Sequence, residues 1–128
     1  MKTLRVGIAT YEEMKARTMA IARGLHKPTS DDPKVWFTSA EAFARVLSDR
    51  NRSVLQIIAE SAPESLAQLA ELTGRQKSNL SRTLKTMARY GFVKLERGPR
   101  GSVIPRVTYK RISLVLPVSP AAQKRPAA

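Results

Sequence analysis

The segment Gln76–Tyr90, QKSNLSRTLKTMARY, carries the residue types that could bind a nucleic acid. At 100° per residue, Leu80, Leu84 and Met87 fall within about 60° of one another on one side of a helix. The opposite side carries only hydroxyl and cationic groups: Ser78, Arg82, Lys85 and Arg89. No acid interrupts the segment. Such a helix suits a polyanion, and a B-form major groove about 12 Å wide accepts it; a solvated basic face is the alternative.

In a major groove, the first turns of this helix would lie nearest to the bases. The predicted recognition residues are Lys77, Ser78, Asn79, Ser81, Arg82, Lys85 and Arg89. Arginine can hold guanine through two parallel hydrogen bonds, and asparagine can do the same for adenine. Asn79 sits at the side of the polar face, so it could instead cap locally. The predicted phosphate contacts are Lys85, Arg89, Arg75, Arg97, Arg100 and Arg106.

The distribution of charge agrees with this interpretation. The formal net charge is +13. Met1–Gly74 holds ten basic and nine acidic side chains, whereas Arg75–Ala128 holds thirteen basic ones and a single acid, Glu96. One basic half points to a nucleic acid or, less often, to an anionic membrane surface. A membrane-binding helix would expose bulky apolar groups, and the apolar residues here keep core-like spacings, so we favour nucleic acid.

Composition argues against catalysis and cofactors. The chain has no cysteine, which excludes disulfides, thiolate catalysis and cysteine-based metal sites. The lone histidine, His26, sits at a predicted helix end, and Glu12, Glu13, Asp31 and Asp32 fall in a first helical turn and a loop. No apolar run approaches the length of a membrane span, and the N-terminus lacks a secretory signal. We therefore expect a cytoplasmic, nucleoid-associated protein that is not an enzyme and binds no metal or cofactor.

Two helices and a hairpin would position the basic helix. Residues 52–61 predict an apolar helix, and Ser65 with Gln68 forms a capping box before a shorter one. Gly74 ends that helix, and a turn of three to four residues that includes this glycine leads to the basic helix, as is typical of a helix-turn-helix. Residues 92–95 and 103–109 predict a hairpin, with Pro105 at an edge position. Its tip carries arginines that suit a minor groove or phosphate, although a surface turn would look alike.

Two further strands flank this core. Residues 2–10 and 110–117 alternate apolar and polar side chains, and we expect them to pair, within one chain or across a dimer. Between them, Thr10 with Glu13 predicts a capped helix over residues 11–25, and Thr38 with Glu41 predicts a second one. Trp36 and Phe37 could stack on bases, but their place before a helix favours packing against that helix. Residues 118–128 predict a disordered basic tail.

The run SLAQLAELTGRQKSNLSRTLKTMARYGFVKLERGPRG resembles the winged helix-turn-helix domain of MarR-like transcriptional regulators. Leu72–Thr73–Gly74, Ser81–Arg82 and Gly91–Phe92–Val93 carry the likeness. Gln76 departs from it, because the family often has Ser or Thr as the helix cap. The whole chain is similar to small prokaryotic winged-helix regulators, some of them antitoxin-like. The resemblance implies a homodimer that binds a palindromic operator.

The expected fold is therefore α+β, mainly α: a winged helix-turn-helix with an added N-terminal strand–helix and a C-terminal strand. We divide the chain into a contact segment (1–37), a DNA-binding domain (38–109), a closing strand (110–117) and the tail (118–128). The expected function is sequence-specific binding of double-stranded DNA by an autorepressor, which could also be the antitoxin of a toxin–antitoxin pair. A structured-RNA-binding protein and a module that neutralises a partner toxin remain alternatives.

Overall fold

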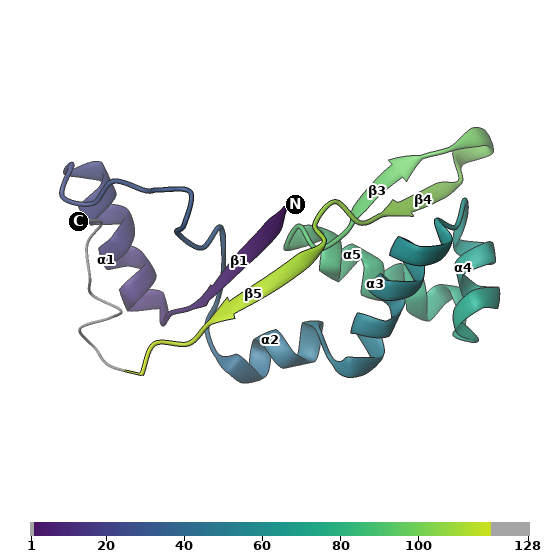
Figure 1. Ribbon diagram of the computed structural model, residues 1–128, viewed down its shortest axis with the longest axis horizontal. Coiled ribbons are helices and arrows are strands. Elements are labelled where there is room, and N and C mark those ends of the chain that lie inside the picture. The colour runs from purple at the N-terminus through teal and green to yellow at the C-terminus, as the bar shows by residue number, and fades with distance from the viewer. Residues whose placement is uncertain (1, 119–128) are drawn as a thin grey trace. The chain divides into compact units, whose positions relative to one another are not determined.

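A computed structural model describes residues 2–118, which form an α+β fold of five α-helices and two small sheets (Figure 1). The chain folds as two compact units. We call Ala44–Lys110 the helical unit, which Lys2 also joins, and Thr3–Phe43 with residues 111–118 the sheet unit. The predicted tail, with Lys124 and Arg125, lies outside the described residues.

The sheet unit is built on a parallel sheet of order β2-β1-β5. Its strands are β1 (Thr3–Ile8), β2 (Val35–Phe37) and β5 (Arg111–Val115), and α1 (Tyr11–Ala22) connects β1 to β2. Val6 lies in the middle, paired with Val35 on one side and Leu114 on the other. The predicted pairing of the two terminal strands is confirmed, and it occurs within one chain.

Trp36 and Phe37 belong to a strand that the sequence did not reveal. Phe37 is buried, and its ring meets that of Phe43 edge to face at 5.5 Å. The Trp36 ring lies against Gly7 of β1, where a Cβ atom would come within 2.5 Å of it. Glycine at position 7 is therefore required by this close approach, and Trp36 packs within its own unit.

The helix caps were predicted in part. Thr10 and Glu13 form the full capping box, with Glu13 N donating to Thr10 Oγ1 (3.1 Å) and Thr10 N to Glu13 Oε1 (2.7 Å). For α2 (Ala40–Val46) the prediction of Thr38 was wrong, because the hydroxyl of Ser39 accepts from Ala42 N at 3.0 Å. The adjacent hydroxyl offers the same chemistry one residue later.

The helical unit contains three helices followed by a hairpin. These are α3 (Asp49–Ser61), α4 (Leu66–Thr73) and α5 (Lys77–Arg89), and the hairpin strands β3 (Lys94–Arg97) and β4 (Val103–Arg106) are antiparallel. α5 packs against α4 and β3, and α3 and α4 also pack against β4. The buried side chains come from the three helices, the residues that follow α5, and β4: Val54, Ile58, Leu69, Leu80, Leu84, Met87, Phe92, Val93 and Pro105. One core thus fixes α5 by its apolar side.

The turn after α3 holds an alanine in the left-handed region. Ala62 caps α3 with φ 44° and ψ 58°, and its N–H donates to Ile58 O. A Cβ atom makes this conformation unfavourable by about 1 kcal/mol, whereas glycine adopts it freely.

We expect Ala62→Gly to raise the free energy of unfolding by about 0.5–1 kcal/mol, measured by urea denaturation. The matched control is Ala59→Gly, inside the same helix, which should lower it by about the same amount. Destabilisation by both changes would contradict the assigned strain.

Candidate nucleic-acid interface

α5 presents opposite chemistry on its two sides. Leu80, Leu84 and Met87 are at most 1 % exposed, as the sequence predicted. The predicted recognition residues that are exposed are Lys77, Ser78, Arg82, Lys85 and Arg89, and Ser81 is half-exposed. Gln76 at the N-cap makes no side-chain hydrogen bond. The helix is therefore held by its buried stripe and leaves its cationic side to solvent.

The cations of α5 are not neutralised within the described chain. The ion pairs found among residues 2–118 use other basic side chains. Arg89 makes only a long hydrogen bond of 3.4 Å, from Nη2 to the Thr86 hydroxyl. These positive charges therefore face solvent without a carboxylate beside them.

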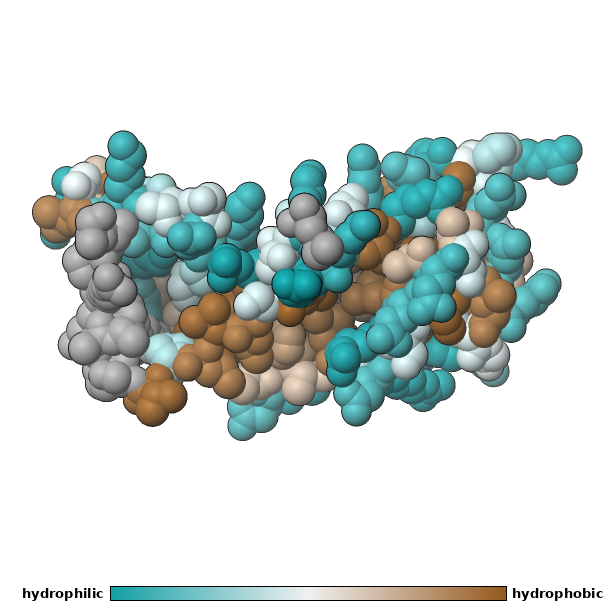
Figure 2. All heavy atoms as spheres, in the orientation of Figure 1, coloured by the Kyte–Doolittle hydropathy of each residue, from teal (hydrophilic) through white to brown (hydrophobic). Residues whose placement is uncertain are grey.

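The hairpin adds a second cationic edge. Its strands pair from Lys94↔Arg106 to Arg97↔Val103, and its tip is the short 3₁₀ turn η1 (Pro99–Gly101). Arg97 and Arg100 are exposed, and hydrophilic side chains cover the tip (Figure 2). Arg100 adopts φ 59° and ψ 31°, a conformation unfavourable for a residue with a Cβ atom. This turn therefore keeps a charged side chain where glycine would be less strained.

Arg106, predicted to contact phosphate, makes several contacts within the helical unit. It is half-buried, and its Nη1 donates to the carbonyl oxygens of Pro63 and Pro105, each at 3.0 Å. Its Nε lies 3.9 Å from Glu96 Oε1. The guanidinium thus ties the hairpin to the segment between α3 and α4, because the carbonyl of buried Pro63 needs a donor. The contact of Arg106 with phosphate stays a prediction.

Arg75 and Asn79, predicted to contact phosphate and a base or a local cap, bond to each other in the structure. Arg75, in the turn between α4 and α5, donates from Nε (3.1 Å) and from Nη2 to Asn79 Oδ1. Its Nη2 also lies 3.2 Å from the Thr83 hydroxyl. Burial, together with the charge of Arg50, lowers the pKa of Arg75. Its guanidinium is thus engaged in hydrogen bonds within the helical unit, and its contact with phosphate stays a prediction.

Asn51 completes this cluster, and the sequence analysis did not identify it. Its Oδ1 accepts from Arg75 Nη1 at 3.0 Å, and its Nδ2 donates to Val46 O at 3.0 Å. Its backbone N–H donates to Ser48 Oγ, the N-cap of α3. Because Asn51 lies 24 residues before Arg75, no local pattern could have joined them.

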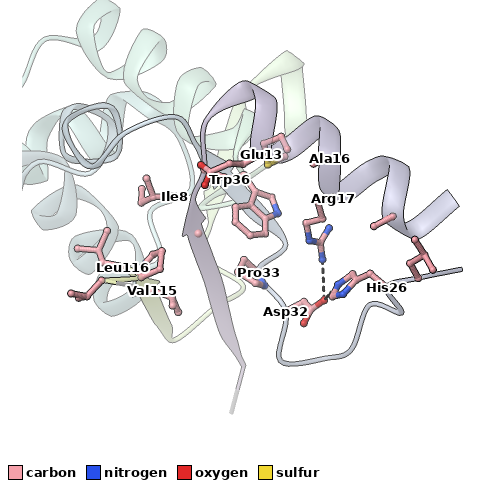
Figure 3. A pocket seen from close by; sticks show the side chains of 17 residues that line it. Ile8, Glu13, Ala16, Arg17, His26, Asp32, Pro33, Trp36, Val115 and Leu116 are labelled. Atoms are coloured by element: carbon pink, nitrogen blue, oxygen red, sulfur yellow. Dashed lines mark hydrogen bonds and ion pairs between the residues drawn. The ribbon is translucent and has the colours of Figure 1, made fainter. Parts of the chain in front are cut away.

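The sheet unit holds a separate cavity of about 850 Å³ beside α1 and the ends of β1 and β5 (Figure 3). Aliphatic side chains and the ring of Trp36 form most of its lining. One wall is polar: Asp32 Oδ2 lies 2.9 Å from Arg17 Nη2 and 3.0 Å from His26 Nε2. Burial opposes the charge of Asp32, but hydrogen bonds from His26, Thr29 and Arg17 hold its pKa below the usual range.

Aliphatic side chains are exposed at the rim of this cavity. Leu25 is 69 % exposed, Leu116 52 % and Val118 98 %. Figure 2 shows hydrophobic side chains gathered around the end of β5. None of the twelve residues of α1 is buried, so the sheet unit keeps much apolar surface in contact with water.

Membrane-spanning helices and metal-binding clusters are both absent from residues 2–118. No helix in this range has the length and apolar character needed to cross a lipid bilayer. The same part of the chain contains no cluster of three His, Cys, Asp or Glu side chains suited to a metal ion.

Comparison with protein families shows which family the chain belongs to. The model of the HVO_A0114 family matches residues 46–114, more than half of the 128-residue chain. This range contains α3, α4, α5 and the hairpin. No similar protein was found among curated sequences or among solved structures. The chain belongs to the HVO_A0114 family.

Proposed function

We propose that the chain is a sequence-specific, double-stranded-DNA-binding transcriptional regulator that represses its own operon. The observation that carries this proposal is the cationic side of α5, which is exposed opposite a buried apolar stripe. Its basic side chains form no ion pair among residues 2–118. In this proposal α4 and α5 form a helix-turn-helix of the MarR-like type, and the β3–β4 hairpin is its wing.

The proposed docking places α5 in the major groove and Arg97 and Arg100 against the adjacent backbone or minor groove. A single copy has a small footprint, so the proposal includes a homodimer that reads two half-sites about one helical turn apart. No catalytic step is proposed, and the protein would act in the cytoplasm at the nucleoid.

The test is binding of the full chain to the DNA upstream of its gene at increasing salt. With six to eight phosphates neutralised, log K should fall with log[salt] at a slope of roughly −5 to −7. Equal affinity for unrelated duplexes at about 200 mM salt would argue against specific readout. A matched structured RNA distinguishes the RNA-binding alternative.

Two single substitutions separate base reading from phosphate binding. We expect Arg82→Ala to relax sequence preference at one or two positions, because a bidentate contact to guanine is worth about 1–3 kcal/mol. Lys85→Ala should weaken all duplexes alike and reduce the salt slope by about 1. Parallel binding-site selections with both variants measure this. The same loss of preference in both would contradict the assigned roles.

The exposed aliphatic rim of the sheet-unit cavity favours a second function, binding of a protein partner. An antitoxin would use such a surface for the toxin encoded by a neighbouring gene, and a dimer would use it for a second copy. Solution mass and pull-down of the neighbouring-gene product by the full chain distinguish the two. A monomer that captures nothing would remove this second function.

A further inference from the structure

The hydrogen bonds of Arg75 determine which way the Asn79 amide is turned. A guanidinium has five N–H donors and no acceptor, so the atom that faces it must be an acceptor. Arg75 Nε and Nη2 both point at one atom of Asn79, which is therefore Oδ1. The Asn51 amide is turned by the same logic, with Oδ1 toward Arg75 Nη1 and Nδ2 toward Val46 O.

The amide nitrogen of Asn79 is left without a partner. No hydrogen bond from its Nδ2 is found among the described residues. No buried side-chain nitrogen or oxygen in that part of the chain lacks a partner. Asn79 Nδ2 is therefore not completely buried, and it lies in the first turn of α5, next to exposed Ser78.

This orientation changes which bases Asn79 can recognise. Reading adenine requires the amide oxygen to accept from N6 while the amide nitrogen donates to N7. An amide oxygen has two lone pairs, and the two guanidinium donors already use them. The Asn79 side chain thus offers N–H donors and no free acceptor.

We propose that Arg75 makes Asn79 a donor-only contact, which selects a G·C base pair in the operator. Guanine presents two adjacent acceptors, O6 and N7, in the major groove, whereas adenine presents a donor beside one acceptor. Arg75 is a positioning residue in this scheme and does not touch the DNA. This inference rests on the proposed function of α5.

Two further contacts hold Arg75 in place. Asn51 ties it to the start of α3, and Thr83 ties it to the second turn of α5. Gln76 provides no side-chain cap. At this end of α5, side-chain hydrogen bonds come instead from Arg75, which links α5 to the start of α3. The side chain stands half-buried and cannot move to another partner without leaving several acceptors unpaired.

The experiment is selection of binding sites from randomised duplexes by the full chain and its variants. Asn79→Ala first identifies the operator position that depends on Asn79. We expect a G·C pair there in the wild-type selection, with about a tenfold preference that the variant loses. Replacing that guanine with 7-deazaguanine, which lacks the N7 acceptor, should weaken wild-type binding and leave the variant's binding unchanged.

A second variant tests the role of Arg75. Arg75→Met keeps an unbranched stem but removes every donor, so the Asn79 amide is free to turn, and preference at the same position should move from G·C toward A·T. Lys77→Met is the control, because it removes a neighbouring exposed charge and should leave the base preference unchanged. If Arg75→Met does not fold, the wild-type and Asn79→Ala selections decide alone.

The outcomes separate this inference from the function on which it rests. A wild-type chain that selects no sequence would overturn both. A chain that selects a defined operator would overturn only the role of Asn79 if its position carries an A·T pair. That role would also be overturned if no position depends on Asn79, or if folded Arg75→Met keeps the G·C preference.

Discussion

Replacing Arg82, Lys85 and Arg89 together with glutamine is expected to weaken binding to duplex DNA several hundredfold at about 0.1 M salt. Each neutralised phosphate contributes about 0.9 to the salt slope, so losing the phosphate contacts of Lys85 and Arg89 should reduce the slope by nearly 2 per bound copy. Loss of the Arg82 contact to guanine weakens binding further. Glutamine keeps helix propensity close to that of lysine and arginine. Fluorescence anisotropy of a labelled duplex at several salt concentrations measures both quantities.

The control for this change removes the same charge from the other unit. Arg23, Lys27 and Lys34 are all exposed and lie in the sheet unit. Their triple replacement with glutamine also lowers the net charge from +13 by three, but it should change the slope by less than about 1. If both variants lost affinity equally, the attraction would belong to the whole charge of the protein and not to α5.

The second large effect concerns stability. Leu84 is 1 % exposed on the side of α5 opposite its cations, and it anchors the helix in the core of the helical unit. Leu84→Ala should lower the free energy of unfolding by about 3 kcal/mol, because buried methyl groups are lost and a cavity remains. Small domains have only about 5–15 kcal/mol in total, so α5 should melt at a markedly lower urea concentration, as followed by circular dichroism.

Leu72 supplies the matched comparison for Leu84. It is also a helical leucine in the same unit, on α4, but it is 47 % exposed. Leu72→Ala should cost less than about 1 kcal/mol, because less apolar area leaves water. Similar losses at both positions would show that the core does not anchor α5 as described.

The parts that sequence could predict are those with a local pattern. The amphipathic spacing of α5, the capping box of Thr10 and the glycine that ends α4 each involve residues within about two helical turns. The pairing of β1 with β5 was predicted by a different argument. Each strand had an apolar side and no partner near it in sequence, so the two were expected to pair with each other. The parallel direction of the pairing had no local signal.

The parts that sequence missed depend on distant partners. Val35–Phe37 has only three residues, too few for a period-2 pattern to distinguish a strand from residues packed before a helix. Arg75 and Arg106 were assigned to phosphate because nothing beside them in the chain suggested other acceptors. Their partners, Asn51 and the Pro63 carbonyl, lie 24 and 43 residues away.

The pairing of β1 with β5 has a consequence for synthesis of the chain. The two strands are more than 100 residues apart in sequence, and the whole run Ala44–Lys110 is inserted between the two parts of the sheet unit. On a ribosome, the inserted helices can fold as soon as they emerge, while β1 still waits for its last neighbour. The nascent protein is therefore expected to form its cationic helix before its completed sheet, with one edge of β1 open to chaperones until β5 has emerged from the ribosome.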